Sequence, residues 1–302
     1  MTFSIKIKEE ISAITEEYNE LRIILLTFLL LNAKIKKGII SFKIENNAVA
    51  RKIYKCIKNT YGISPSITIR IQKRFRHKQI YILEIKEKTM QIISELKDID
   101  YEFLCDSEVD KIAFLKGVFL ACGSISDPKN SGYHLEFTSK LKKDTILIKK
   151  ILSTFNINGK VIKRENNYMF YLKEAERISD VLKIIGAINN LFYFEDIRIY
   201  RDHKNMVNRL NNCDIANQEK TIKNGLKQVK DIFYIKENNI YDLFDDKSKD
   251  VINYRLKYPE VSYVELAEII SLETGYKITK SGINHHFIKI RKLIERHKKM
   301  IK

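Results

Sequence analysis

The stretch FLKGVFLACGSI, which runs from Phe114 to Ile125, decides the fold. It predicts a short apolar helix that ends in a patch of small residues. Gly117 lies inside this helix, where a glycine costs about 1 kcal/mol relative to alanine. Because glycine has no side chain, it lets a second backbone approach closely. We therefore expect this helix to pack directly against another one.

A candidate for the second helix lies upstream, at Leu25 to Ala33, with the sequence LLTFLLLNA. It is also a short apolar run, and a strand-like segment follows it. Two similar helices that each begin a similar series of elements indicate an internal duplication. Two ordinary buried helices explain the apolar periodicity of these segments equally well.

Helices and strands follow in the same order in both halves of the chain. A polar helix is expected at 5–20. In the first half we then expect an apolar helix at 21–33, strands at 39–44, 66–72 and 79–85, and helices at 48–61 and 88–98. In the second half we expect a helix at 109–122, a strand at 133–138, a helix at 142–155, a hairpin at 160–172 and a helix at 174–185. This mixed order is typical of an α+β fold.

The chain is strongly basic. It has 55 Lys and Arg against 38 Asp and Glu, a formal net charge of +17 over 302 residues. Such an excess favours a polyanionic partner, of which nucleic acid is the usual one. A general enrichment in Lys, Ile and Asn explains part of the charge without any functional demand.

The four cysteines are scattered without a CxxC spacing, which indicates neither a disulfide framework nor a zinc site. We find no secretory signal at the N-terminus. The apolar run at 21–33 is shorter than the roughly 20 residues that a membrane span needs. The sequence therefore predicts a cytoplasmic protein with no membrane partner.

Positively charged residues cluster on the predicted hairpin at 66–85. Alternate side chains of a strand share a face, so several of these cations line one sheet surface. They are candidates for contacts to a DNA backbone, and a solvated strand edge that resists aggregation is the alternative. The candidates are Arg70, Lys73, Arg74, Arg76 and Lys78.

Residues 186–240 mix Asn, Arg and Asp with scattered apolar residues. We expect a long helical connector here, with its clearest helix at 218–232. A docking segment that bridges the domains is favoured over a second nucleic-acid surface.

The last part of the chain predicts three helices. The first runs from 246 to 256 and ends before Pro259, as expected of a residue that precedes proline. Ser262 and Glu265 form the pattern of a capping box that opens the second helix. Gly275 interrupts the chain before the third helix. One stripe of that helix is apolar, with Ile283, Phe287, Ile290 and Ile294.

A short helix followed by a longer basic helix is the helix-turn-helix arrangement, whose second helix enters the major groove of DNA. Asparagine can pair with adenine and lysine can donate to guanine, whereas cations further along bind phosphates. From Lys277 to Lys302 there are nine Lys and Arg and one acid. A basic helix that caps a bundle is the alternative. The predicted DNA-binding residues are Ser262, Lys277, Thr279, Lys280, Ser281, Asn284, His285, Lys289, Arg291 and Lys292.

No catalytic motif is present. The sequence lacks a Walker loop, GxGxxG, GxSxG and HExxH. His285 and His286 are adjacent, so on a helix they point to different sides and do not share one metal. We predict no catalytic residue, no metal site and no cofactor.

Three segments together resemble the WhiA family of bacterial DNA-binding regulators. They are FLKGVFLACGSISDPKNSGYHLEFTS, FEDIRIYRDHKNMVNRLNNCDIANQEKT and ITKSGINHHFIKIRKL. The resemblance covers nearly the whole chain in order. The family is associated with sporulation in actinobacteria and with cell division and chromosome segregation in Firmicutes.

The resemblance implies an α+β fold, with a two-repeat LAGLIDADG-like αββαββα domain followed by an all-α helix-turn-helix domain. It also implies that the nuclease activity has been lost, because the acidic metal-binding positions of the repeats fall on Asn32 and Cys122. The expected domains are a first repeat, a second repeat, a helical connector and the helix-turn-helix domain, at 1–100, 101–190, 191–244 and 245–302.

We therefore predict a non-enzymatic DNA-binding protein that regulates transcription in cell division and chromosome segregation. Its partner is double-stranded DNA, with another regulatory protein as a second candidate, and its place is the nucleoid. Two alternatives stay open: an active metal-dependent DNA endonuclease, and a protein-binding scaffold that contacts DNA incidentally.

Overall fold

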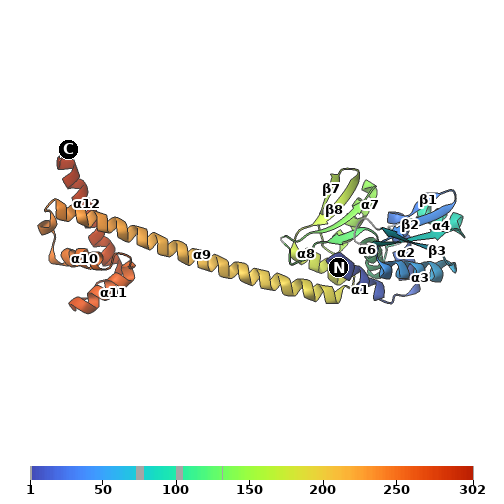
Figure 1. Cartoon of the computed structure of the whole chain (residues 1–302), viewed down its shortest axis with the longest axis horizontal. Coiled ribbons are helices and arrows are strands. Elements are labelled where there is room, and N and C mark those ends of the chain that lie inside the picture. The colour runs from blue at the N-terminus through green and yellow to red at the C-terminus, as the bar shows by residue number, and fades with distance from the viewer. Residues whose placement is uncertain (1, 73–77, 100–104, 131, 302) are drawn as a thin grey trace. The chain divides into compact units, whose positions relative to one another are not determined.

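The protein is described by a computed structural model (Figure 1), which covers residues 2–72, 78–99, 105–130 and 132–301. The chain folds into two compact units, Met1–Asp202 and His203–Lys302. Each unit has a hydrophobic core of its own. A helix of 50 residues, α9 (Ile188–Glu237), belongs partly to the first unit and partly to the second.

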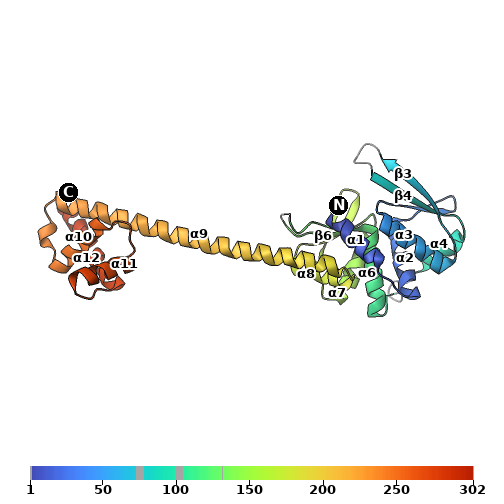
Figure 2. The same cartoon turned by 60° about the horizontal axis from the view of Figure 1, so that its bottom comes forward.

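The first unit contains two copies of one series of helices and strands. The first copy consists of α2 (Tyr18–Asn32), β1 (Lys34–Lys36), β2 (Ile39–Ile44), α3 (Asn47–Tyr61), β3 (Ser66–Gln72), β4 (Lys78–Ile85) and α4 (Thr89–Asp98). Its antiparallel sheet has the order β1-β2-β4-β3. Figure 2 shows α3 and α4 on one side of β3 and β4. Phe42 pairs with Leu83 on the buried face of this sheet.

The second copy repeats this order. It consists of α6 (Glu108–Cys122), β5 (Gly123–Ile125), β6 (Leu135–Ser139), α7 (Lys142–Thr154), β7 (Lys160–Arg164), β8 (Asn167–Leu172) and α8 (Ala175–Ile184). The antiparallel sheet has the equivalent order β5-β6-β8-β7, and Phe137 pairs with Phe170 in its core. The predicted duplication and the α+β fold are therefore confirmed.

Two local predictions need correction. The predicted polar helix at 5–20 is interrupted: α1 (Phe3–Ala13) ends, and α2 begins only at Tyr18. The break turns Glu16 inward, where its carboxylate pairs with Lys52 and Lys116. Strands β1 and β5 were not predicted, because three residues are too few to show a period-2 pattern.

Helices α2 and α6 pack against each other at the centre of the first unit. Gly117 of α6 lies so close to α2 that a Cβ atom on it would be 2.9 Å from the carbonyl oxygen of Ile24 and 2.9 Å from the Cβ of Thr27. Phe28 and Phe114 are buried on the two helices. The close approach predicted from the glycine is confirmed.

Helix α1 contacts both repeats. The Ser4 hydroxyl donates to the Ile125 carbonyl oxygen at 2.8 Å and accepts from the Ile125 amide at 2.8 Å, at the first strand of the second sheet. The Asn46 side chain, which caps α3 of the first repeat, donates to the Glu9 carboxylate at 3.2 Å. This helix therefore ties the two repeats together.

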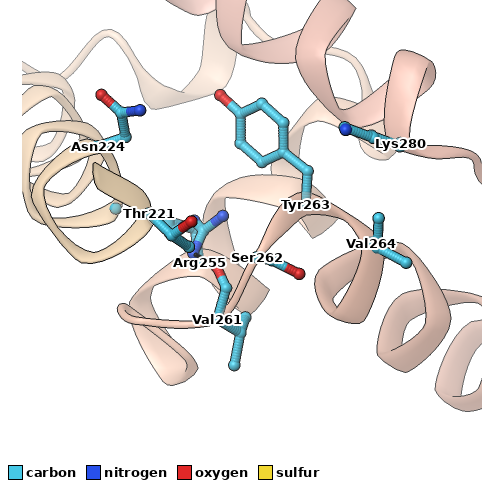
Figure 3. Close-up of a pocket in the computed structure, with 9 residues that line it drawn as sticks. Thr221, Asn224, Arg255, Val261, Ser262, Tyr263, Val264 and Lys280 are labelled. Carbon is cyan, nitrogen blue, oxygen red and sulfur yellow. Dashed lines mark hydrogen bonds between the residues drawn. The ribbon is translucent and has the colours of Figure 1, made fainter. Parts of the chain in front are cut away.

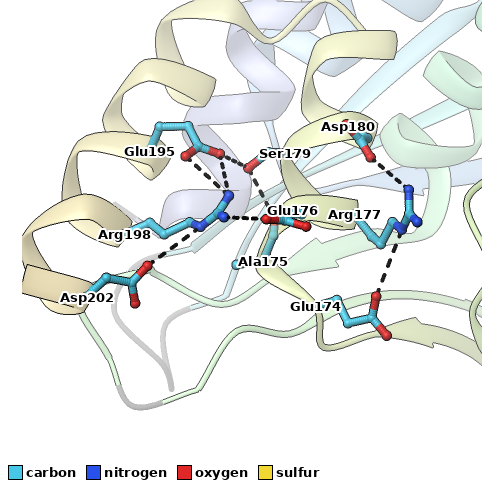
Figure 4. Close-up of polar contacts among 9 residues, drawn as sticks. All are labelled: Glu174, Ala175, Glu176, Arg177, Ser179, Asp180, Glu195, Arg198 and Asp202. Atoms are coloured by element: carbon cyan, nitrogen blue, oxygen red, sulfur yellow. Dashed lines mark hydrogen bonds and ion pairs between the residues drawn. The ribbon is translucent and has the colours of Figure 1, made fainter. Parts of the chain in front are cut away.

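The first turns of α9 are fixed to the first unit by charged groups (Figure 4). The Arg198 guanidinium pairs with Glu176 of α8 at 2.9 Å and with Glu195 at 3.2 Å. At the helix N-terminus, the Glu10 carboxylate accepts from the Asn189 amide at 2.6 Å. A carboxylate at this end of a helix compensates the helix dipole.

The second unit combines the end of α9 with a short 3-10 helix and three α-helices. These are η1 (Tyr241–Leu243), α10 (Asp246–Lys257), α11 (Tyr263–Thr274) and α12 (Lys280–Ile301). Ile232 and Ile235 of α9 are fully buried in the core that these helices form. The compact unit thus includes part of the segment that was expected to be a connector.

Candidate nucleic-acid interface

Two caps and a tight turn position the helix-turn-helix pair. The Ser262 hydroxyl accepts from the Glu265 amide at 3.3 Å, and the Glu265 carboxylate accepts from the Ser262 amide at 2.7 Å, so the predicted capping box is present. Gly275 ends α11 in the left-handed conformation, with φ of 77°. The Thr279 hydroxyl accepts from the Gly282 amide at 3.2 Å and opens α12. The hydroxyls of Ser262 and Thr279 therefore serve as helix caps.

One stripe of α12 is buried, and the opposite face is exposed. The buried stripe is the predicted one, with Ile283, Phe287, Ile290 and Ile294 between 0% and 5% exposed. On the opposite face, exposed residues recur at helical spacing. They are Ser281, His285, Ile288 and Lys292.

Most of the other predicted contacts are also exposed. Lys277, Lys280, Asn284 and Arg291 all present their side chains to solvent. The exposure of these residues leaves their polar groups available to a partner.

Lys289 differs, because its ammonium group is bound within the unit. Its Nζ pairs with the Asp245 carboxylate at 2.8 Å. The bonds from Lys289 and from the Ser248 hydroxyl lower the pKa of Asp245 to about 2. Lys289 is thus engaged at the start of α10 rather than extended from the exposed face.

The two adjacent histidines have different surroundings. His285 is exposed, whereas His286 is half-buried and its Nδ1 lies 2.8 Å from the Ser248 hydroxyl. Burial lowers the pKa of His286. The ring centroids are 6.5 Å apart, and the two histidines belong to no metal-binding group among the described residues.

The described part of the predicted basic hairpin places Arg70 on the outer face of the first sheet. Arg70 pairs with Ile80, and Lys43 of β2 pairs with Ile82. Ile80 and Ile82 alternate along β4 with the buried Leu83, so they lie on the face opposite the core. Arg70 and Lys43 therefore share this outer face.

The structure says little about the positions of the other hairpin candidates. Lys78 is the first residue of β4. Lys73, Arg74 and Arg76 lie outside the described residues.

Asn32 and Cys122, to which the family resemblance assigns the acidic positions of the repeats, lie at the ends of the paired helices. Asn32 ends α2, and its side-chain amide donates to the Ala121 carbonyl oxygen of α6 at 3.1 Å. Cys122 ends α6. Burial raises the pKa of the Cys122 thiol to about 12, so the thiol is neutral at pH 7. A neutral thiol and an engaged amide are poor ligands for Mg²⁺, which prefers carboxylate oxygens.

A lysine lies beside these two positions. Lys8 of α1 lines a cavity of about 260 Å³ together with Asn32, Lys43 and Glu45. Burial lowers the pKa of Lys8, and the negative charge of Glu45 opposes that shift. Among the residues that the structure describes, no three His, Cys, Asp or Glu side chains lie close enough to hold a metal ion.

These features define a class of protein: a helix-turn-helix unit joined to a duplicated α+β domain. Three family models match the chain, "WhiA N-terminal LAGLIDADG-like domain" over residues 30–97, "WhiA LAGLIDADG-like domain" over 111–204 and "WhiA C-terminal HTH domain" over 207–294. The chain belongs to the WhiA family.

Sequence relatives and a solved structure agree with this assignment. The "Probable cell division protein WhiA" of Bacillus cytotoxicus is 40% identical over 266 residues, which are 85% of this chain and 83% of that protein. The protein of the same name from Bacillus mycoides is equally similar. The crystal structure of full-length DUF199/WhiA from Thermatoga maritima matches 98% of this chain and 99% of its own, with 27% identity and a TM-score of 0.59. No described helix is both long enough and apolar enough to cross a membrane.

The sequence analysis missed two residues of these sites. Ile288 is 44% exposed in the middle of the polar face of α12. An apolar side chain there can contact a thymine methyl group, and its position between His285 and Lys292 is visible from helical spacing alone. Lys8 was missed because its nearness to Cys122, more than a hundred residues away, depends on how α1 packs across the repeats.

Proposed function

We propose that this protein is a non-enzymatic DNA-binding regulator, and that α12 enters the major groove of its target. The exposed face of α12 opposite its buried stripe is the observation that carries this proposal. Because the stripe fixes the helix in the core, Ser281, Asn284 and His285 are held outward in the first turns, from which such helices reach base edges. The Asn284 amide can form a paired contact with adenine.

The remaining charges of the unit favour contacts to phosphates. Lys277, Arg291 and Lys292 are exposed around α12 and would add affinity without reading sequence. On the first unit, Arg70 and Lys43 offer a smaller basic surface on the outer face of the first sheet. That surface suits a second backbone contact, whereas a regulatory protein is the other partner that the duplicated domain could bind.

The repeat junction supports the absence of nuclease activity. Asn32 and Cys122 provide no carboxylate at the ends of the paired helices. Neither residue could therefore replace the charged ligands that metal-dependent hydrolysis needs.

The names of the relatives support the biological role. Proteins that are 40% identical are called probable cell division proteins. We infer that this protein acts in cell division and chromosome segregation by regulating transcription at the nucleoid.

Selection of bound duplexes from a random pool tests the reading of sequence by α12. The full chain should enrich a preferred site, and Lys280→Ala with Asn284→Ala should lose that preference, because each lost base contact costs about 1–3 kcal/mol of discrimination. The control is Lys299→Ala at the far end of α12, which should weaken binding to all duplexes alike. Equal losses in both proteins on preferred and random DNA would refute base reading by this helix.

Incubation with supercoiled and relaxed DNA and Mg²⁺ tests the absence of nuclease activity. We expect no cleavage products. Cleavage that EDTA abolishes would show that the repeat junction, or another site, still binds a catalytic metal.

A further inference from the structure

A pocket of about 170 Å³ lies between α9 and the helix-turn-helix pair of the second unit (Figure 3). Thr221, Asn224 and Gly225 of α9 form one side of it. The other side consists of Arg255, Val261, Ser262, Tyr263, Val264 and Lys280. Since a water molecule occupies about 30 Å³ in the liquid, the pocket has room for one tetrahedral oxyanion.

Arg255 gives this pocket a buried positive charge. Its side chain is only 1% exposed, and its Nη1 donates to the carbonyl oxygens of Tyr258 at 3.2 Å and Val261 at 2.8 Å. The buried Nε has no hydrogen-bond partner. Among the described residues, no carboxylate forms an ion pair with this guanidinium. The guanidinium also faces the rings of Tyr263 and Phe287, at 5.8 and 5.7 Å from the ring centroids. Its buried charge still lacks a counter-ion, which an anion in the pocket would supply.

The start of α11 supplies hydrogen-bond donors to the same pocket. Tyr263 and Val264 are in the first turn, where backbone amides have no acceptor within the helix. The Ser262 hydroxyl accepts from the amide of Glu265, one position further on. Together with the helix dipole, free first-turn amides favour a bound phosphate. Lys280 adds an exposed ammonium group at the rim.

Helix α9 extends the positive surface beyond the pocket. Lys220, Lys223 and Lys227 are exposed at spacings of three and four residues, which places them on one face beside Asn224. Gly225 fixes the position of α9, because a Cβ atom on it would lie 2.0 Å from the Pro259 carbonyl oxygen. Gly225 thus fixes α9 in the unit, while Lys220, Lys223 and Lys227 face solvent on another side of the helix, next to Asn224.

We propose that this pocket binds a phosphate group, and that in the complex with DNA this group is a backbone phosphate held between α9 and the helix-turn-helix pair. The proposal rests on the DNA-binding function proposed above and deepens it. It makes α9 part of the DNA-binding surface, whereas the sequence analysis favoured a docking role for this segment.

Asn224→Asp in the full chain tests this site, because it adds a negative charge at the exposed rim and leaves Arg255 and the core unchanged. The matched control is Asn212→Asp, the same substitution at an exposed position of α9 outside the pocket. We expect Asn224→Asp to weaken duplex binding about tenfold, as one unfavourable charge contact does. The dependence of log Kd on log salt should also become shallower by about 0.9, the value of one phosphate contact.

Competition with inorganic phosphate shows whether the pocket binds a free phosphate ion or only a phosphate of the DNA backbone. Phosphate that displaces duplex more strongly than sodium chloride at the same ionic strength, in the wild type and not in Asn224→Asp, shows a pocket that also takes the free anion. Phosphate that acts like chloride, together with the tenfold loss of duplex affinity, assigns the site to the DNA backbone.

Equal duplex affinity and equal phosphate sensitivity of Asn224→Asp and Asn212→Asp would overturn the proposal. This outcome differs from a failure of the proposed function. If the wild type binds duplex and Asn284→Ala, which lies outside the pocket, weakens it, DNA binding stands and only the phosphate pocket is refuted. If the wild type does not bind duplex at all, the proposed function itself fails.

Discussion

The backbone of Gly117 lies against the backbone of Ile24, and a Cβ atom on the glycine would be only 2.9 Å from the Ile24 carbonyl oxygen. This contact joins α6 of the second repeat to α2 of the first. The nearest atoms are the backbone of Ile24 and the Cβ of Thr27, whose position the backbone fixes, so they cannot move aside as the end of a side chain could. The glycine thus sets the distance between the two central helices.

Gly117→Ala should destabilise the protein. Alanine favours a helix by about 1 kcal/mol over glycine, but separating two packed helices costs about 1–3 kcal/mol and offsets that gain. The measurement is urea unfolding followed by circular dichroism. Gly282→Ala in α12 is the matched control, because the nearest atom there is a side-chain carbon of Ile278 at 3.2 Å, and it should be neutral or slightly stabilising. Equal unfolding midpoints for the two variants would contradict the account.

The sequence predicted the repeated part of the fold well, for a physical reason. The contact between the repeats is predicted by a short local sequence, Gly117 and the apolar residues around it. The buried face of α12 is likewise predicted by the helical spacing of its apolar residues, Ile283, Phe287, Ile290 and Ile294. A buried helix face with 3.6-residue periodicity, or a close contact between two helix backbones at a glycine, can therefore be predicted from the sequence.

Features that depend on packing between distant segments were not predicted from the sequence. Glu16 looked like part of a polar helix, and only its pairing with Lys52 and Lys116 explains why the helix breaks there. The pocket beside Arg255 combines residues of α9 with residues about thirty to sixty positions later, and no local sequence pattern predicts that combination. Lys289 fitted the basic face by composition, although the structure pairs it with Asp245.

Glu16→Gln should strongly destabilise the first unit. The Glu16 side chain is 1% exposed and shares its charge between Lys52 and Lys116, which are also almost fully buried. Glutamine keeps the shape but leaves two buried cations without a counter-ion, and breaking a buried ion pair in this way costs about 3–5 kcal/mol. Chemical denaturation measures the change.

An exposed ion pair provides the control for this prediction. Glu84 pairs with Lys86 at 3.6 Å, and both side chains are well exposed. Glu84→Gln should therefore change the stability by less than about 1 kcal/mol. A loss for Glu16→Gln as small as that for Glu84→Gln would show that the buried charges are compensated in another way.

Gly225→Ala should detach α9 from the helix-turn-helix pair. A Cβ atom would overlap the Pro259 carbonyl oxygen at 2.0 Å, so the helix must shift and the contact of Gln228 with Tyr263 must loosen. Hydrogen exchange should show faster exchange of the amides of α9 in the second unit. Leu226→Ala, at a neighbouring exposed position, should leave this exchange within the variation of the wild type. If both variants protect α9 equally, the glycine does not fix the helix.

His286 should make the stability of the second unit depend on pH. Burial lowers its pKa below the usual 6.5, an effect that His285, Lys289 and Lys247 increase and Asp245 opposes. The unfolded chain therefore binds a proton at a higher pH than the folded one, so the stability that the neutral ring contributes is present above about pH 6.5 and is lost as the pH falls below it. Thermal unfolding between pH 7.5 and 5.5 should show a falling midpoint. His286→Gln should reduce the slope of that fall, whereas His203→Gln, at an exposed position of α9, should keep it. An unchanged slope in His286→Gln would mean that the ring does not titrate in this range, and that its contact with Ser248 does not depend on its charge.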